Sequence, residues 1–186
     1  MDLREMLKEY VPYNEQEQKD KKVILDFLSH GYKVFSRENE VAHFTASAWV
    51  VNKARDKVLM IYHNTYNSWA WTGGHADGNE NLLEVAINEA MEETGIHEVK
   101  PILKEIFSLE IITVDGHIKR GSYVPSHLHM NVTFLLEADD KELLIVKPDE
   151  NSGVAWISVD KVSEACSEPW MMKWIYEKLI DKSKGY

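Results

Sequence analysis

The feature that most constrains this chain is a glycine-rich turn followed by a short helix that carries several glutamates. Residues 73–79 read Gly-Gly-His-Ala-Asp-Gly-Asn, a composition typical of a turn. Asn81 stands where a helix N-cap is expected, and Glu84 has the spacing of a capping box. Gly95 can adopt the left-handed conformation that ends a helix. The sequence therefore predicts a helix over residues 82–94, with glycines on both sides of it.

Three glutamates of this helix share one face. Glu89 and Glu93 are one turn apart, and Glu92 falls beside them. Like charges at these spacings repel each other and weaken the helix unless a cation lies among them. Carboxylates on a rigid helix suit Mg²⁺ or Mn²⁺, which keep free positions for water and for substrate phosphates. The alternative interpretation is a solvated acidic face.

The segment from Gly74 to Ile96 resembles the signature box of the Nudix hydrolase family. That pattern is Gly, five residues, Glu, seven residues, Arg-Glu, a hydrophobic residue, any residue, Glu-Glu, any residue, Gly and a hydrophobic residue. The matching residues are Gly74, Glu80, Glu89, Ala90, Glu92, Glu93, Gly95 and Ile96. Residues 69–74 and 155–157 also resemble the family's strand before the box and its closing strand. The chain is thereby identified as a member of this family.

One position departs from the pattern, because Asn88 stands where the family has arginine. In the family that arginine helps to orient the neighbouring catalytic glutamate. An amide can donate hydrogen bonds but carries no charge and has a shorter reach. Activity could be lower, or a Lys or Arg from elsewhere could take over the role. Asn88 is thus the argument for an alternative function, a nucleotide-binding module with weak or no catalysis.

The resemblance implies a hydrolase that depends on Mg²⁺ or Mn²⁺ and cleaves a nucleoside diphosphate linked to another moiety, with water attacking phosphorus. It assigns catalysis and metal binding to Glu89, Glu92 and Glu93, with the Gly73 carbonyl as a further metal ligand. One of these glutamates, or a carboxylate from another loop, would act as general base. Candidates for a second metal or for the base are Glu80, Asp149 and Glu150; for the last two the alternative is a solvated turn.

Some residues near the box are candidates for substrate binding. Trp69 and Trp71 could stack on a base or simply pack in the core. His75 could donate to a phosphate oxygen or only brace the turn. Lys119 and Arg120 could reach phosphate, although loop cations are usually solvated.

A later segment places polar residues on one side of a predicted strand. His127, His129 and Asn131 alternate with apolar residues, so their side chains share a face. We expect this face either to line the substrate cleft or to be an ordinary surface. A zinc site made of histidines alone is disfavoured, because no third histidine has a suitable spacing.

The remaining pattern predicts a mixed fold. We expect helices to residue 10 and over residues 15–30, and strands near residues 44–51, 58–62, 102–113, 129–136 and 155–159. A C-terminal helix should begin at Pro169, with an apolar stripe that packs in the core, made of Trp170, Met171, Trp174, Ile175 and Leu179.

Together these elements indicate an α/β (α+β) fold, a Nudix-like α/β/α sandwich around a mixed sheet. Residues 1–36 would form an N-terminal helical extension, and residues 37–186 the hydrolase domain.

Composition excludes several classes of protein. No apolar stretch is long enough to cross a membrane, and the first residues are charged, so no export signal is expected. Cys166 is the only cysteine, which rules out an intramolecular disulfide and favours the cytoplasm. The net charge of −10 argues against general nucleic-acid binding. We expect a small nucleotide-like diphosphate as partner, and a homodimer through the N-terminal helices is possible.

Two other readings of the fold remain. An isomerase of isopentenyl diphosphate is disfavoured, because that chemistry in the family uses a cysteine early in the fold, whereas Cys166 comes late. A structural protein with an acidic helix would keep its stability when divalent metal is removed.

Overall fold

The centre of the molecule is a curled mixed sheet, and the computed structural model describes residues 2–119 and 121–186. Its two longest strands, β1 (Ala42–Val51) and β9 (His127–Glu137), run parallel in the middle. The sheet continues from β1 to β2 (Lys57–His63) and β10 (Asn151–Ser158), each antiparallel to its neighbour. Most of the sheet is therefore antiparallel around one parallel pair.

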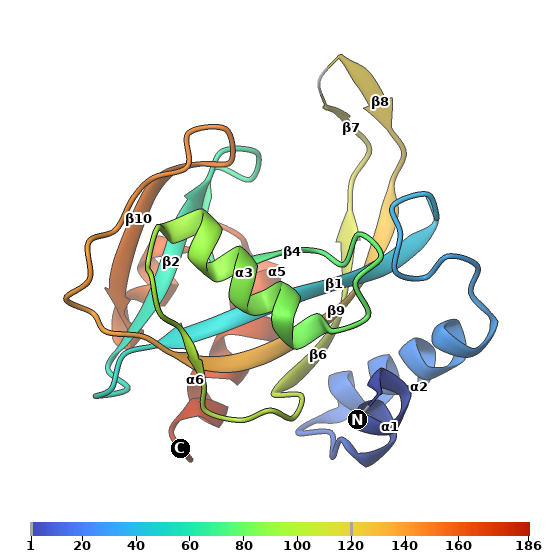
Figure 1. Cartoon of the computed structure of the whole chain (residues 1–186), viewed down its shortest axis with the longest axis horizontal. Coiled ribbons are helices and arrows are strands. Elements are labelled where there is room, and N and C mark those ends of the chain that lie inside the picture. Colours follow the sequence, from blue (N-terminus) through green and yellow to red (C-terminus); the bar gives the residue numbers. More distant parts are fainter. Residues whose placement is uncertain (1, 120) are drawn as a thin grey trace.

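Shorter strands complete the sheet. They are β3 (Ser68–Ala70) on β2, β4 (Thr72–His75) on β1, and β5 (Lys100–Pro101) and β6 (Ser108–Val114) on β9. β4 pairs with the middle of β1, from Thr45 to Ala48, and β2 pairs with the end of β1 at Val51. The glycine-rich turn therefore leaves the sheet beside the middle of β1. A separate hairpin, β7 (His117–Lys119) and β8 (Ser122–Val124), stands away from the body (Figure 1).

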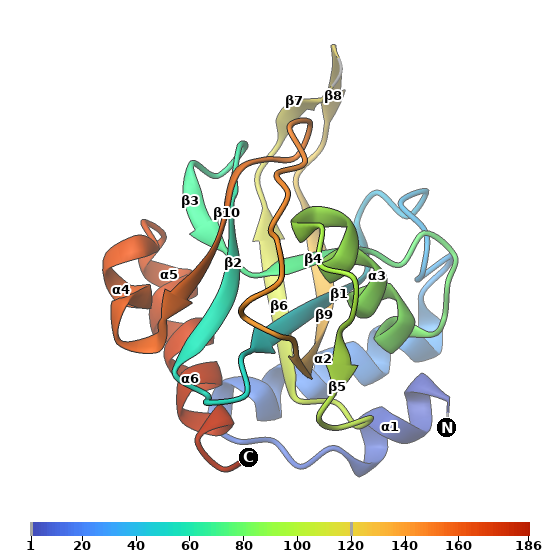
Figure 2. The same cartoon turned by 60° about the vertical axis from the view of Figure 1, so that its left-hand side comes forward.

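Helices cover both faces of the sheet (Figure 2). The box helix α3 (Leu82–Thr94) packs on β1 and β4. The opposite face carries α4 (Val162–Ala165), α5 (Pro169–Met171), the π-helix η2 (Met172–Tyr176) and α6 (Glu177–Ser183). Alternate residues of β1 serve the two sides: Phe44 belongs to the core under α3, and Trp49 to the core under the C-terminal helices. The expected α/β sandwich is confirmed.

The N-terminal helices α1 (Leu3–Glu9) and α2 (Glu15–His30) close the exposed edge of the sheet at β6. The Gln16 amide donates to the Leu109 carbonyl at 2.9 Å, and the Ile111 amide donates to Asp20 at 3.1 Å. Neither backbone group is paired with β9, and the Leu109 carbonyl also accepts a longer bond from Lys178 at 3.4 Å. Side chains of α2 thus take the place of a further strand.

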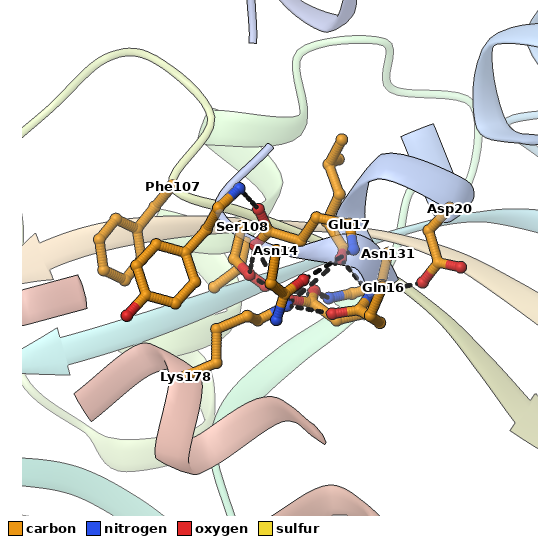
Figure 3. Close-up of polar contacts among 12 residues, drawn as sticks. Asn14, Gln16, Glu17, Asp20, Phe107, Ser108, Asn131 and Lys178 are labelled. Carbon is orange, nitrogen blue, oxygen red and sulfur yellow. Dashed lines mark hydrogen bonds and ion pairs between the residues drawn. The ribbon is translucent and has the colours of Figure 1, made fainter. Parts of the chain in front are cut away.

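A buried ionic network ties α2 to α6 and to the sheet (Figure 3). Glu17 and Glu110 are both fully buried, and the Lys178 ammonium lies 3.1 Å and 3.0 Å from their carboxylates. Glu110 also accepts hydrogen bonds from Asn131 at 2.9 Å and Thr133 at 2.8 Å. The N-terminal helices are therefore connected to the centre of the sheet through charged groups as well as apolar packing.

The expected strand over residues 102–113 is wrong in one respect. The strand β6 begins only at Ser108, and residues 103–106 form an irregular segment between β5 and β6. The amides of Ile102 and Phe107 donate to Leu135 and Thr133 of β9. The segment thus advances by five residues while β9 advances by two. Regular pairing is interrupted, although both ends of the segment stay bonded to β9.

The expected apolar stripe of the C-terminal helix is also only partly correct. Ile175 and Leu179 are fully buried, but Trp170 is 47% exposed and Trp174 is 41% exposed. At about 100° per residue Trp170 and Trp174 lie at one edge of the stripe and Ile175 and Leu179 at the other, so the face that packs on the core is narrower than the stripe. The π-helix η2 also interrupts the regular period after Met171.

Candidate active site

The box helix is positioned by the caps that its sequence predicts. The Asn81 side chain accepts from the Glu84 amide, and Gly95 ends the helix in the left-handed conformation, with φ of 74°. The reciprocal capping bond from Glu84 is absent in the described residues, because the Asn81 amide donates to Asn79 instead. These ends fix the rotation of α3, which turns Glu89 and Glu93 toward the glycines of β4.

Gly74 makes room for the carboxylate of Glu89, and Gly73 lets β4 lie close to β1. A Cβ on Gly74 would overlap the carboxylate of Glu89, and one on Gly73 would overlap the carbonyl of Ala46 on β1. The Gly73 amide donates to Glu93 Oε2 at 3.0 Å. The glycine pair is thus a close approach of backbone to carboxylate that any side chain would block.

Glu150, from the turn before β10, completes a group of three carboxylates with Glu89 and Glu93. One oxygen from each residue lies within 4.8 Å of the others. Burial, reinforced by the neighbouring carboxylates, raises the pKa of Glu89 to about 7 and that of Glu93 to about 8. Without a cation, Glu93 is mostly protonated at pH 7 and Glu89 is protonated in about half of the molecules.

Lys147 is the cation closest to the group, and the sequence did not single it out. Its ammonium lies 3.1 Å from Glu150 and 3.5 Å from Glu92. Burial lowers its pKa, but the hydrogen bond and charge of Glu150 outweigh this, so that the net pKa is raised. Lys147 therefore stays charged beside the carboxylates, and its partner Glu92 lies one helical turn after Asn88.

A buried asparagine holds this turn against the box helix. Asn151 is fully buried, and its amide group donates to the Glu93 carbonyl at 2.9 Å. Its backbone amide donates to the Lys147 carbonyl at 2.8 Å. Asn151 thereby places Glu150 and Lys147 next to the end of α3; its position after Asp149 and Glu150 in a turn-like stretch is a weak sequence signal for it.

The other carboxylates named from the sequence lie outside the group. Glu92 is exposed and contacts only the edge of the site through Lys147. Glu80 and Asp149 are exposed, as is Asn88. Within the described chain the Asn88 side chain makes no hydrogen bond.

A cavity of about 650 Å³ opens beside Gly73, Gly74 and Glu93. Its polar wall carries Thr45, Ser47, His75, His129 and Asn131, and its aromatic wall carries Tyr66, Trp71 and Trp170. Trp71 is mostly buried, with its ring edge-on to Tyr176 at 5.6 Å, whereas Trp69 packs on Tyr62 and does not line the cavity. Lys119 is exposed on β7, and Arg120 lies outside the described residues.

The strand β9 turns its polar face inward. Asn131 lies at the cavity floor and accepts from the hydroxyls of Thr45 at 2.8 Å and Ser47 at 2.9 Å. His127 and His129 lie on the same face, with their Nε2 atoms 3.1 Å apart. This face is buried, so it is not an ordinary surface.

Two more histidines join them from other strands. One ring nitrogen each from His43, His75, His127 and His129 lies within 4.8 Å of the others. Burial lowers the pKa of His75 to about 3 and that of His129 to about 2, so both rings are neutral at pH 7. The argument from spacing against a third histidine does not hold in the folded chain.

Comparison with known proteins places this geometry in a family. The sequence model of the NUDIX domain matches residues 41–181. The chain is 28% identical over 141 residues to a probable DHNTP pyrophosphohydrolase of Lactococcus lactis, covering 76% of this chain and 81% of that protein. It is 28% identical over 118 residues to the rat asymmetrical bis(5'-nucleosyl)-tetraphosphatase, covering 63% and 71%.

Solved structures share the fold. A Caenorhabditis elegans Ap4A hydrolase in a binary complex superposes with a TM-score of 0.53 at 15% identity, over 77% of this chain and 98% of that one. The Escherichia coli dihydroneopterin triphosphate pyrophosphohydrolase gives 0.54 at 13% identity, over 75% and 92%. The chain belongs to the NUDIX family and is a hydrolase of phosphoric anhydride bonds. No helix in the described part is long and apolar enough to cross a membrane.

Proposed function

We propose that the protein is a divalent-metal-dependent pyrophosphohydrolase of a nucleoside diphosphate linked to another moiety. The observation that carries this proposal is the convergence of Glu89, Glu93 and Glu150 on one another, with Glu93 also lining a cavity that has aromatic walls. Phosphates would lie over the carboxylates and Gly73. The base or other ring system would lie against Trp71 and Trp170, where aromatic surface is available for stacking.

The carboxylate group fits Mg²⁺ or Mn²⁺. Its donors are hard oxygens, and Gly74 keeps the space in front of Glu89 free of a side chain. Glu89 and Glu93 would hold the ion, with the Gly73 carbonyl as a further candidate. When bound, a divalent cation neutralises phosphoryl charge and activates water. Glu92, at the exposed edge, would contribute through an outer position or through Lys147.

Glu150 is our candidate for the general base. It comes from a different element than Glu89 and Glu93. Those two residues can therefore stay on the metal while Glu150 accepts a proton from the attacking water. Lys147, at 3.1 Å, would hold this carboxylate in place and reduce the repulsion within the group. Glu80 and Asp149, both exposed, are weaker candidates for this role or for a second metal.

The names of the relatives suggest the substrates to test first. The proposed experiment measures nucleotide and phosphate release from pterin and nucleoside triphosphates, dinucleoside polyphosphates and nucleoside diphosphate sugars, with Mg²⁺ or Mn²⁺ against EDTA. We expect metal-dependent cleavage of at least one compound, abolished in Glu93→Gln. Glu150→Gln should lower kcat by about a hundredfold or more while metal affinity changes little.

The alternative is a binding module without catalysis, which only Asn88 favours. It predicts metal and nucleotide binding by calorimetry, with no turnover across the panel. That result would replace the proposed activity.

A further inference from the structure

We propose that His43, His75, His127 and His129 form a second metal site, specific for a transition-metal dication such as Zn²⁺ and distinct from the carboxylate group. The proposal is independent of the proposed hydrolase activity. It rests on the placement of the four rings, on their hydrogen bonds and on the chemistry of nitrogen ligands.

The strand register brings the four rings together. His43 on β1 lies opposite His129 on β9, and His127 precedes His129 by two residues on the same face. His75 comes from β4, on the other side of β1. The ring centroids of His43 lie 4.9 to 5.1 Å from those of the other three. Three strands that are distant in sequence thus supply one compact cluster.

Hydrogen bonds orient two of the rings as metal ligands. The His43 Nδ1 atom lies 3.0 Å from the Asn39 carbonyl, and the His127 Nδ1 atom lies 2.9 Å from the Pro125 carbonyl. A carbonyl only accepts, so each Nδ1 carries the proton and each Nε2 presents a lone pair to the cluster. Histidines that bind metal are held in this way, by a backbone carbonyl on the far nitrogen.

One of these lone pairs has no partner. His43 is 3% exposed, and its buried Nε2 has no hydrogen-bond partner among the described residues. Such an atom is unfavourable in the folded protein unless something binds it. Because the Asn39 carbonyl occupies Nδ1 of His43, Nε2 is the nitrogen left for the group of ring nitrogens that lie within 4.8 Å of one another. This is the observation that calls for a ligand.

The four donors select the class of metal. Neutral imidazole nitrogens favour Zn²⁺, Ni²⁺ and Cu²⁺ over Mg²⁺, which prefers oxygen. In a tetrahedral zinc site, Zn–N bonds of about 2.0–2.1 Å place the nitrogens about 3.3 to 3.4 Å apart. The separation of 3.1 Å between His127 and His129 is close to this value, and the other nitrogens, which lie within 4.8 Å of one another, would have to approach by no more than about 1.5 Å.

The carboxylate of Asp77, whose charge acts on His43, does not compete for the ion. Asp77 is engaged by Arg37 and is therefore not free to act as a ligand. His75 and His129 line the cavity, which gives the ion a route of entry from solvent. A bound ion would link β1, β4 and β9 beside the glycines that hold the carboxylate group.

The test is Zn²⁺ binding to the EDTA-treated full chain, followed by calorimetry and by the melting temperature. Zn²⁺ could also bind the carboxylates, so the measurement is made in both the wild type and Glu93→Gln. We expect one Zn²⁺ retained in Glu93→Gln, and a rise in Tm of about 5 °C or more at a hundredfold excess over Kd. His43→Gln and His129→Gln should weaken this binding at least about tenfold.

His97→Gln is the matched control, because it removes an exposed histidine outside the cluster, and it should bind Zn²⁺ as the wild type does. If His43→Gln does not fold, as judged by circular dichroism, His75→Gln replaces it. The proposal is overturned if the wild type binds no Zn²⁺, if Glu93→Gln loses it all, or if the cluster variants bind as tightly as His97→Gln.

Discussion

At the scale of single residues, the ionised carboxylate of Glu93 destabilises the folded protein unless a cation lies beside it. It is 4% exposed, and burial raises its pKa from 4.5 to about 8. Below about pH 4.5 the carboxyl is protonated in both folded and unfolded chains, so it has no effect. Between 4.5 and 8 the unfolded chain loses the proton first, so the metal-free protein loses stability as pH rises and bears the full cost above pH 8.

Glu93→Gln should therefore stabilise the metal-free protein at high pH. In EDTA at pH 8.5 we expect its Tm to exceed that of the wild type by roughly 5 °C or more, with little difference near pH 4. Gln keeps an oxygen for the Gly73 amide. With excess Mg²⁺ the difference in Tm should become smaller or change sign, because only the wild type gains stability from the metal. Equal melting temperatures at pH 8.5 in EDTA would contradict this account of Glu93.

The second prediction at this scale concerns how substitutions at Lys147 and Asn88 change kcat. If Lys147 replaces the charge of the missing arginine, Lys147→Ala should lower kcat by about tenfold. Asn88→Arg should restore much of that loss, because its side chain can reach Glu92 one turn later and the neighbouring Glu89. In the wild-type background, Asn88→Arg should leave activity equal or higher.

Asn88→Ala is the control for this pair, since the Asn88 side chain is exposed. It should keep activity within about twofold. Full turnover in Lys147→Ala would show that this lysine only neutralises surface charge, and a clear loss in Asn88→Arg would show that the site is adapted to asparagine.

At the scale of secondary-structure elements, the box helix was predictable and some of its neighbours were not. Asn81 and Gly95 are local signals, so the expected range 82–94 agrees with Leu82–Thr94 in the structure. The irregular segment at residues 103–106 depends on which carbonyls of β9 pair with the amides of Ile102 and Phe107, and no local sequence pattern predicts this pairing. The exposure of Trp170 and Trp174 likewise depends on which side of the C-terminal helices faces the core, and a broad apolar stripe does not decide this.

The junction between α2 and α6 supplies the prediction at this scale. Lys178→Met should leave Glu17 and Glu110 buried without their shared cation, which typically costs about 3 kcal/mol or more. For a chain of this size, Tm should fall by about 6 °C or more. Lys184→Met removes an exposed pair with Asp181 and should change Tm by no more than about 2 °C. Equal effects of the two substitutions would mean that the buried network adds nothing to stability.

At the scale of the whole molecule, the site depends on contacts that no sequence spacing reveals. His43 was missed because β1 lies far from His127 in sequence, although the parallel pairing places it directly opposite His129. Glu150 could be named as a candidate, but its place beside Glu89 depends on the bonds of Asn151 to α3. The sequence therefore identifies the helix that carries the candidate carboxylates, whereas long-range pairing decides which other residues meet it.

The same long-range contacts bear on the expected division at residue 36. The family match begins at residue 41, yet Leu7 and Ile24 are fully buried in the core under α3. Glu17 shares Lys178 with Glu110, and α2 covers the open edge of β6. We propose that the N-terminal helices are an integral part of the folded domain and not a separable extension.

Deletion of residues 1–36 should therefore prevent stable folding. It would expose apolar surface from the core, leave Glu110 with less of its network and free an unpaired strand edge that promotes aggregation. The measurement is the Tm and the oligomeric state of the shortened chain, compared with a chain that lacks only residues 1–2, which precede α1. A monomeric shortened chain that melts within a few degrees of the full protein would show instead that residues 37–186 fold alone, and that the helices serve another purpose, such as contact with a second copy.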